Sequence, residues 1–323
     1  MKIFITGAAG FIGSNLSSTL LKAGHTVIGL DDFSYGEKRN IAGFKDNPNF
    51  TFHEGNVLDI QNYLQDDIDA VVHLASQKIP RYTTAYKTIV DNNLMTDKVI
   101  EACLQINARL VFASTSDVYG KNPHVPFTEN SDLVLGPTKV KRWAYAASKL
   151  FSEHKIIATS DEKGLEYCIM RFFGSYGPNQ NLTWWGGPQS VFIGKAQQDE
   201  TIEIHGHGQQ TRTFTYIDDT VQGIVLCITA ANAKNEIYNI ASNPTEEITI
   251  ENLGKVIWHL VRGEHSDPKL EFIPYETFGN YEDVMRRVPS IDKIKSQLGF
   301  EPKHSLIEGL KATIDWQLTL GEA

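Results

Sequence analysis

Residues Lys2–Gly13 read KIFITGAAGFIG, and this segment predicts the architecture of the first half of the chain. Its first five residues form a short apolar run typical of a buried strand, and a helical pattern over Phe11–Ala23 begins where the glycines end. Gly7, Gly10 and Gly13 permit a tight turn and let backbone N–H groups approach a pyrophosphate at the helix N-terminus. The segment therefore predicts a dinucleotide-binding strand–turn–helix unit.

Asp31 supports this interpretation, because it closes the second predicted strand, His25–Leu30. A carboxylate roughly 20 residues beyond the glycines binds the adenosine ribose hydroxyls in dinucleotide-binding folds. Asp31 is followed by Asp32, and two adjacent negative charges disfavour the 2′-phosphate of NADP. The predicted cofactor is therefore NAD, although Lys38 and Arg39 stand nearby.

Strand and helix patterns alternate up to residue 173. Beyond the first two strands, the expected strands are Asn49–Glu54, Asp69–Leu74, Arg109–Ala113 and Glu166–Phe172, and the expected long helices are Tyr82–Ile106 and Trp143–Lys163. Such alternation predicts an α/β fold, a Rossmann-type doubly wound parallel sheet with helices on both faces. After residue 173 the pattern loosens, so we predict a NAD-binding domain over 1–173, with a return near 216–240, and a smaller α/β substrate-binding cap over 174–323.

Composition excludes several classes of protein. The 323 residues are 41% hydrophobic and 21% charged, which suits a globular chain of about two domains. A net charge of −9 argues against a nucleic-acid surface. No apolar run approaches the roughly 18 residues of a membrane span, and the three scattered cysteines predict a cytoplasmic protein without a disulfide framework. His205 and His207 lack acidic or cysteine partners nearby, so no metal site is expected.

Two further segments carry chemistry. Tyr145 and Lys149 lie four residues apart, which places them on one face of the helix predicted over Trp143–Lys163. A phenol has a pKa near 10, and a neighbouring ammonium favours the phenolate, so Tyr145 is a candidate base. Hydroxyl groups follow the strand at Arg109–Ala113, where the carboxyl end of a parallel strand faces the ligand crevice.

With these motifs the chain resembles an extended short-chain dehydrogenase/reductase of the nucleotide-sugar epimerase, dehydratase and decarboxylase family. The resemblance covers nearly the whole length. The segments that carry it are GAAGFIG (7–13), DDFSYG (31–36), HLAS (73–76), STSDVYG (114–120), YAASK (145–149), RFFGSYGP (171–178) and GQQTRTFTYIDD (208–219).

The resemblance implies roles for individual residues. Thr115 would hydrogen-bond the reacting sugar O4, with Ser116 and Asp117 beside it, Tyr145 would be the base, and Lys149 would assist it and reach the nicotinamide ribose. The implied cofactor residues are Gly7, Gly10, Phe11 and Ile12 at the pyrophosphate, Asp31, Asp32, Ser34 and Gly36 at the adenosine ribose, Asn56 and Val57 at adenine, and Leu74, Ala75, Ser76, Asn92, Tyr145 and Lys149 along the remaining groove. The implied substrate residues are Lys78, Gly174, Arg212, Asp283 and Arg287, with Arg212 gripping the nucleotide diphosphate.

The same resemblance leaves the reaction open. Gly174 stands at a position where many epimerases carry Asn. Asn56 stands at a position where the adenine-contacting pair of the family often begins with Asp. Dehydratases typically place Asp-Glu after the threonine and decarboxylases Ser-Glu, whereas this chain has Ser116-Asp117. The expectation is an NAD-dependent UDP-sugar 4-epimerase of the UDP-glucose or UDP-glucuronate type. The alternatives are a UDP-glucuronate decarboxylase that uses Asp117 and Arg287, and a non-catalytic NAD-binding protein. Relatives commonly form homodimers through the two long helices, near 82–106 and 143–163.

Overall fold

A seven-stranded, wholly parallel sheet forms the centre of the molecule in the computed structural model, which describes residues 1–78, 84–279 and 282–321. Its strands are β1 (Lys2–Thr6), β2 (Thr26–Asp31), β3 (Phe50–Glu54), β4 (Ala70–His73), β5 (Arg109–Thr115), β6 (Tyr167–Phe172) and β11 (Glu236–Ile240). They lie in the order β11-β6-β5-β4-β1-β2-β3. The strand order reverses direction between β1 and β4, and this confirms the predicted Rossmann-type fold.

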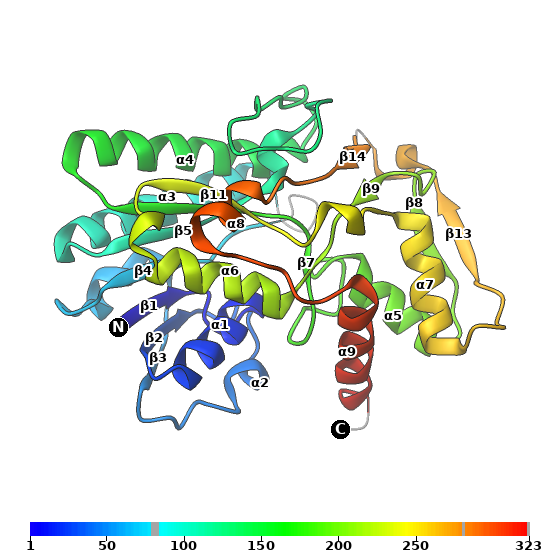
Figure 1. Ribbon diagram of the computed structural model, residues 1–323, viewed down its shortest axis with the longest axis horizontal. Coiled ribbons are helices and arrows are strands. Elements are labelled where there is room, and N and C mark those ends of the chain that lie inside the picture. Colours follow the sequence, from blue (N-terminus) through cyan, green and yellow to red (C-terminus); the bar gives the residue numbers. More distant parts are fainter. Residues whose placement is uncertain (79–83, 280–281, 322–323) are drawn as a thin grey trace.

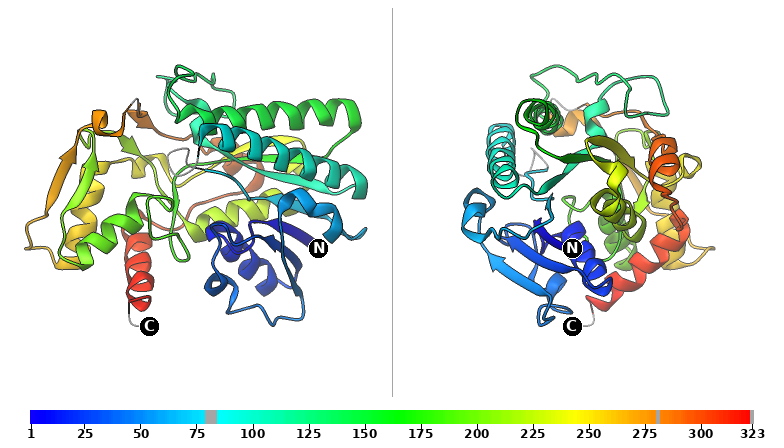
Figure 2. Two further views of the ribbon diagram at one scale, coloured as in Figure 1. Left: turned by 180° about the vertical axis from the view of Figure 1, so that it is seen from behind. Right: turned by 60° about the vertical axis from the view of Figure 1, so that its left-hand side comes forward.

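Helices cover both faces of this sheet (Figure 2). Helices α1 (Phe11–Lys22) and α6 (Ile217–Thr229) pack on one face, and α3 (Ala85–Ile106) and α4 (Trp143–Lys163) pack on the other. Because strand side chains alternate, Ile3 and Ile5 of β1 join the apolar core under α1 and α6, while Phe4 joins the core under α3 and α4. Both faces are therefore buried, which is why the strands read as continuous apolar runs.

Most predicted boundaries differ from the structure by one or two residues. Helix α4 covers the predicted range, and β5 extends two residues further, to Thr115. The predicted start of the third helix at Tyr82 lies outside the described residues. Within them α3 begins at Ala85, after Thr84 accepts a hydrogen bond from the Lys87 N–H at 3.0 Å.

Residues beyond 173 contribute to two regions (Figure 1). Residues 217–240 supply α6 and β11 to the central sheet, and α8 (Asp292–Leu298) packs beside β11. The remaining elements form a smaller body at one end of the sheet: β7 (Ser175–Tyr176), α5 (Pro188–Gln197), β8 (Ile202–His205), β9 (Thr211–Arg212), β10 (Thr215–Tyr216), β12 (Ile248–Thr249), α7 (Ile250–Arg262), β13 (Leu270–Ile273), β14 (Arg286–Arg287) and α9 (Leu306–Thr319). A short α2 (Lys38–Ile41) follows β2. The domain boundary at residue 173 stays a prediction.

None of the helices in the described part of the chain has both the length and the apolar character needed to cross a bilayer.

Candidate active site

A cavity of about 840 Å³ lies where the carboxyl ends of the central strands meet the smaller body. This is where ligands bind in doubly wound sheets. The cavity gathers nearly all the residues that the sequence singles out: Gly7, Gly10, Phe11, Ile12, Asp31, Asp32, Ser34, Gly36, Asn56, Val57, Leu74, Ala75, Ser76, Lys78, Thr115, Ser116, Asp117, Tyr145, Lys149, Gly174, Arg212, Asp283 and Arg287. Their individual roles stay predictions.

The glycine loop forms one wall and leaves space beside the start of α1. Gly7 has a φ of +74°, and a Cβ there would lie 2.9 Å from the backbone nitrogen of Ala75. A Cβ at Gly10 would meet only the carbonyl oxygen of Gly7 within 4 Å, at 3.2 Å, so it would project into the open cavity. No side chain caps the N-terminus of α1 at Gly10. The loop is thus shaped to admit a diphosphate next to backbone N–H groups.

Asp31 also has a structural role, because it holds two loops together. Its two carboxylate oxygens accept hydrogen bonds from the N–H groups of Ala9, at 2.9 Å, and Phe33, at 2.8 Å. The carboxylate therefore ties the glycine loop to the 31–37 loop while it lines the cavity. Burial raises its pKa, although these hydrogen bonds oppose the shift.

The two basic residues of the 31–39 segment point to neighbouring carboxylates. Lys38 Nζ lies 3.6 Å from Glu54, and Arg39 Nε lies 2.8 Å from Glu37. Neither basic side chain is among the residues that line the cavity. This arrangement agrees with a cofactor that lacks a 2′-phosphate.

Asn92 is the exception among the predicted cofactor residues, since it does not line the cavity. It is 3% exposed, on α3, and its amide holds the loop that follows β4. The Asn92 side-chain oxygen accepts from the Gln77 N–H at 2.8 Å, and its nitrogen donates to the Gln77 carbonyl at 3.2 Å. Cofactor contact by Asn92 stays a prediction, and in this structure the residue shapes the cavity wall from behind.

The candidate catalytic side chains converge from two elements. Thr115 ends β5, and its hydroxyl accepts a hydrogen bond from the Asp117 N–H at 3.1 Å, which starts the 3₁₀ helix η2 (Ser116–Tyr119). Tyr145 lies in the first turn of α4, and the side chains of Ser76 and Thr115 lie close enough to its phenol to lower the pKa of that group. Lys149 follows one turn later and is 2% exposed. A phenol, two hydroxyls and an ammonium group therefore share one wall of the cavity.

The electrostatics of Tyr145 differ from the expectation. Burial raises the pKa of the phenol well above its ordinary value, and the Asp117 carboxylate raises it further, whereas the side chains of Ser76 and Thr115 lower it. Burial also lowers the pKa of Lys149 to about 7, opposed by the charge of Glu153. The prediction that the ammonium favours the phenolate is wrong for the protein without ligands, because desolvation dominates both groups.

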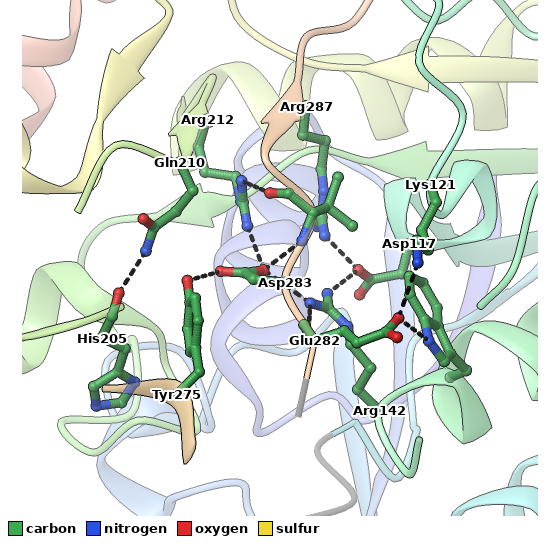
Figure 3. A network of polar contacts seen from close by, with 12 residues as sticks. Asp117, Lys121, Arg142, His205, Gln210, Arg212, Tyr275, Glu282, Asp283 and Arg287 are labelled. Carbon is green, nitrogen blue, oxygen red and sulfur yellow. Dashed lines mark hydrogen bonds and ion pairs between the residues drawn. The ribbon is translucent and has the colours of Figure 1, made fainter. Parts of the chain in front are cut away.

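Three arginines and two aspartates form a further part of the cavity wall (Figure 3). Arg287 Nη2 lies 2.6 Å and Arg142 Nη2 3.2 Å from the same oxygen of Asp117. Arg142 Nη1 and Arg212 Nη2 each lie 2.8 Å from one oxygen of Asp283. Burial raises the pKa of Asp117, but Arg287, Arg142 and Arg212 outweigh it and hold that pKa below its ordinary value. Both aspartates are thus ionised near neutral pH, and the cluster carries a surplus positive charge.

Arg142, Tyr35 and Gln77 also line the cavity, although the sequence assigns them no individual role. Trp185 belongs to an aromatic loop that the sequence marks as a candidate for stacking on the ligand. It lines the cavity too, and its ring stacks on Tyr35 with centroids 3.8 Å apart and planes 7° apart. Lys78 donates to the Trp185 carbonyl at 3.3 Å. The Trp184-Trp185 pair in a glycine-rich segment is the feature of the sequence that points to this stack. That Tyr35 is the partner of Trp185 depends on tertiary packing, which the sequence pattern does not show.

The cavity fits a dinucleotide on its own evidence. The space that a Cβ at Gly10 would fill lies at the uncapped start of α1, where a diphosphate can accept from the N–H groups of Phe11 and Ile12. Asp31 and Asp32 would hold ribose hydroxyls at one end, and Lys149 would donate to the second ribose at the other. In the described ranges, no group of three or more His, Cys, Asp or Glu side chains is arranged to hold a metal ion.

Comparison with known proteins agrees with this geometry. The profile of the NAD dependent epimerase/dehydratase family matches residues 3–241. UDP-N-acetyl-alpha-D-glucosaminuronate decarboxylase of Bacillus cytotoxicus is 33% identical over 98% of this chain and 97% of its own length. UDP-glucuronic acid decarboxylase 1 of Danio rerio is 34% identical over 98% of this chain and 72% of its own length.

Solved structures give the same result. The UDP-glucuronic acid 4-epimerase of Bacillus cereus, in complex with UDP-glucuronic acid and NAD, is similar with a TM-score of 0.87 and 29% identity, over 99% of this chain and 100% of its own. The UDP-glucose 4-epimerase of Thermotoga maritima, with UDP-glucose, has a TM-score of 0.86 and 27% identity, over 99% of each chain. The chain therefore belongs to the NAD-dependent epimerase/dehydratase family, and its cofactor is NAD.

Proposed function

We propose that the protein is a UDP-sugar 4-epimerase that oxidises the sugar at C4 to a 4-keto intermediate and reduces it again from the other face. The observation that carries this proposal is the placement of Tyr145 and Thr115 in the same cavity as the glycine loop. The family relatives named above act on UDP-sugars, and this supports the same class of substrate here. A phenol in this position can exchange a proton with a hydroxyl group of the sugar.

NAD supplies, when bound, the acceptor that takes the C4 hydride and returns it. The residues of the chain handle the proton. Thr115 positions the C4 hydroxyl. Tyr145, acting as the phenolate, removes the hydroxyl proton as the C4–H bond breaks, and the phenol that results returns it when the carbonyl is reduced. Lys149 holds the ribose end of the cofactor and shares the wall with Tyr145. The cycle is redox-neutral, so no cofactor is consumed.

The nucleotide half of the substrate would lie against the arginine wall. Arg212 of β9 would pair with the diphosphate, and Asp283, which accepts from the Tyr275 hydroxyl at 3.0 Å, would receive a ribose hydroxyl. Lys78 and Gly174 also line the cavity, and the sugar would lie beside them. The surplus positive charge of this wall suits an anionic ligand.

Asp117 favours epimerisation over decarboxylation. Loss of CO₂ from a 4-keto sugar acid leaves an enolate, and C5 must then receive a proton. Asp117 is held ionised by Arg287 and Arg142, with a lowered pKa, so it is a poor proton donor. Re-reduction of the keto sugar needs no such donor.

UDP-glucuronate decarboxylation is the second candidate. Arg287 lines the cavity beside Ser116, at 3.4 Å from its hydroxyl, where a carboxylate on C5 could pair with it. Two relatives at 33–34% identity are named as decarboxylases of UDP-sugar acids. A sugar carboxylate that displaces Asp117 from Arg287 would also free Asp117 to take part in proton transfer.

One incubation separates the candidates. Purified protein is mixed with NAD⁺ and either UDP-glucuronate or UDP-glucose, and the products are followed by NMR. Epimerisation gives the C4 epimer with no net NADH and no CO₂. Formation of a UDP-pentose with CO₂ would instead establish the decarboxylase, and recovery of both substrates unchanged would favour a non-catalytic NAD-binding protein.

The assembly and compartment are also proposals. Leu94 of α3 is 47% exposed and Phe151 of α4 is 52% exposed, and the two helices pack side by side. Large apolar side chains on adjacent helices suit a homodimer through this face. The buried free thiols of Cys103, Cys168 and Cys227 suit the cytoplasm.

A further inference from the structure

Arg142 occupies an unusual position in the cavity wall. It is the last residue before α4, three positions ahead of Tyr145, and its side chain is only 14% exposed. Its Nη1 donates to an oxygen of Asp283 at 2.8 Å and to the Glu282 carbonyl at 2.7 Å, while its Nη2 donates to Asp117 at 3.2 Å. One guanidinium group thus contacts two segments, at 117 and at 282–283, that are distant from each other in sequence.

The other two arginines of the cluster have narrower roles. Arg287 of β14 pairs with Asp117, and Arg212 of β9 pairs with Asp283. In the contacts recorded for the described residues, Arg142 is the arginine that bonds to both carboxylates (Figure 3). It therefore links η2, which follows Thr115, with the chain before β14 and with the start of the helix that bears Tyr145.

We propose that Arg142 is a positioning residue for proton transfer at Tyr145: it fixes the Asp117 carboxylate in its pair with Arg287 and docks residues 282–284 onto the start of α4. This inference rests on the proposed function, since it assigns Tyr145 the proton. Arg142 acts through Asp117 and Asp283. A guanidinium fork can serve two carboxylates at once, which a lysine ammonium on a longer, more mobile stem does less well.

Arg142 should affect the pKa of the Tyr145 phenol through the charges that surround it. Asp117 is the charged group that raises the pKa of the Tyr145 phenol. Facing Asp117 are the cations Arg287, Arg142 and Arg212 together with the like charge of Asp283, and Lys78 lies within electrostatic range from the loop after β4. Lys149 lies on the same helix as Tyr145. Loss of Arg142 leaves Asp117 less compensated, so the phenol keeps its proton to higher pH.

The test compares Arg142→Gln, Arg142→Lys and, as a matched control, Arg286→Gln. Arg286 is the neighbour of Arg287, is 59% exposed, and pairs with Glu247 outside the cavity. Two quantities are measured on NAD-loaded protein. One is the pH profile of UDP-sugar turnover, and the other is the ¹³Cζ shift of labelled tyrosine without substrate, with Tyr145 assigned from Tyr145→Phe.

Arg142→Gln should move both the rising limb of the profile and the Tyr145 transition to higher pH, so that the rate on that limb falls about threefold to tenfold. Arg142→Lys keeps the charge but cannot bond to both carboxylates as the guanidinium fork does, so it should restore only part of the shift. Arg286→Gln should cause none. Unchanged transitions in Arg142→Gln, or an equal shift in Arg286→Gln, would overturn the proposal.

One further variant, Asp117→Asn, keeps the proposal testable. If Arg142→Gln does not fold, Arg142→Lys and Asp117→Asn remain, and Asp117→Asn should move the Tyr145 transition to lower pH because it removes the charge that Arg142 compensates. A transition that stays in place in Asp117→Asn contradicts the proposal. Turnover that is absent in every variant while the NMR transition still shifts would count against the proposed function and not against this inference.

Discussion

The carboxylate of Glu153 and the guanidinium of Arg171 form a two-point ion pair directly behind the candidate active site. Arg171 Nη2 lies 2.7 Å from one Glu153 oxygen and Nε lies 3.1 Å from the other, and both side chains are under 5% exposed. Ser114 of β5 also donates to Glu153. Because Glu153 lies one turn beyond Lys149, the pair anchors α4 to β6, and the bond from Ser114 anchors it to β5.

Glu153→Gln should destabilise the protein strongly. The substitution leaves the Arg171 charge buried without its partner, and breaking such a pair costs about 3–5 kcal/mol of the free energy of unfolding. Urea denaturation measures the change. Glu162→Gln, at an exposed position near the end of the same helix, is the control and should leave stability nearly unchanged. Equal stability of the two variants would show that the pair contributes nothing.

Lys149 should make stability depend on pH. Burial lowers its pKa to about 7 in the folded protein, whereas a lysine in the unfolded chain titrates near 10.4. Between these values the unfolded chain binds one more proton, so the free energy of unfolding rises with pH by up to about 1.4 kcal/mol per unit.

This dependence is measured as the difference between wild-type protein and Lys149→Met, both freed of cofactor, in urea at pH 7, 8 and 9. The difference should grow in favour of the wild type as pH rises. Lys163→Met, at the exposed end of α4, should show no such trend. A pH-independent difference for Lys149→Met would mean that the ammonium stays protonated throughout.

Tyr145→Phe should abolish C4 oxidation while NAD still binds. The phenol is the proposed acceptor of the C4 hydroxyl proton, and loss of a general base typically lowers turnover about 10²- to 10⁴-fold. Turnover of UDP-sugars and NAD affinity by calorimetry are the two measurements. Tyr86→Phe, on the exposed side of α3 at 77% exposure, should retain both. Wild-type turnover in Tyr145→Phe would require another base.

The stacked rings of Tyr35 and Trp185 should slow the release of NAD. They join the 31–37 loop to the 181–187 segment across the cavity, and their separation gives up an aromatic contact worth about 0.5–1.5 kcal/mol. Tyr35→Ala and Trp185→Ala should each speed NAD dissociation roughly twofold to tenfold, as followed by stopped-flow fluorescence. Tyr35→Phe keeps the ring but loses the bond to Gln77, so release close to the wild-type rate is expected from it. Equal acceleration in Tyr35→Phe would assign the effect to the hydroxyl.

Charges on the exposed face of α3 and α4 should separate the proposed dimer. Leu94→Glu combined with Phe151→Glu places carboxylates on the apolar face, and like charges brought together there are unfavourable. Analytical ultracentrifugation should then give a monomer. Leu318→Glu, at a 49% exposed position on α9, should leave the assembly intact. A monomeric wild-type protein would refute the proposal at once.

Much of the fold is predictable because local and long-range preferences agree. The strand Lys2–Thr6 and the helix Trp143–Lys163 have the same bounds in the sequence pattern and in the structure, since each is buried along a continuous apolar run or stripe. The cavity-lining residues follow from motifs at the carboxyl ends of strands, because parallel strands bring those ends to one edge.

The rest depends on contacts that no local pattern encodes. The two-residue strands β9, β12 and β14 leave no periodic signal, yet they carry Arg212 and Arg287 to the cavity. The place of Arg142 between two aspartates depends on where residues 282–284 return. The direction of the Tyr145 pKa shift depends on how deeply the helix is buried, which spacing alone does not express.

The course of the chain through β11 restricts how this architecture can change. Because β11 pairs with β6 along Glu236–Ile240, a cut after residue 173 would strip the sheet of its outer strand and of α6 and α8. The segment after residue 173 is therefore not a unit that recombination or an engineer can exchange in one piece, because any replacement would have to rebuild the edge of the central sheet as well.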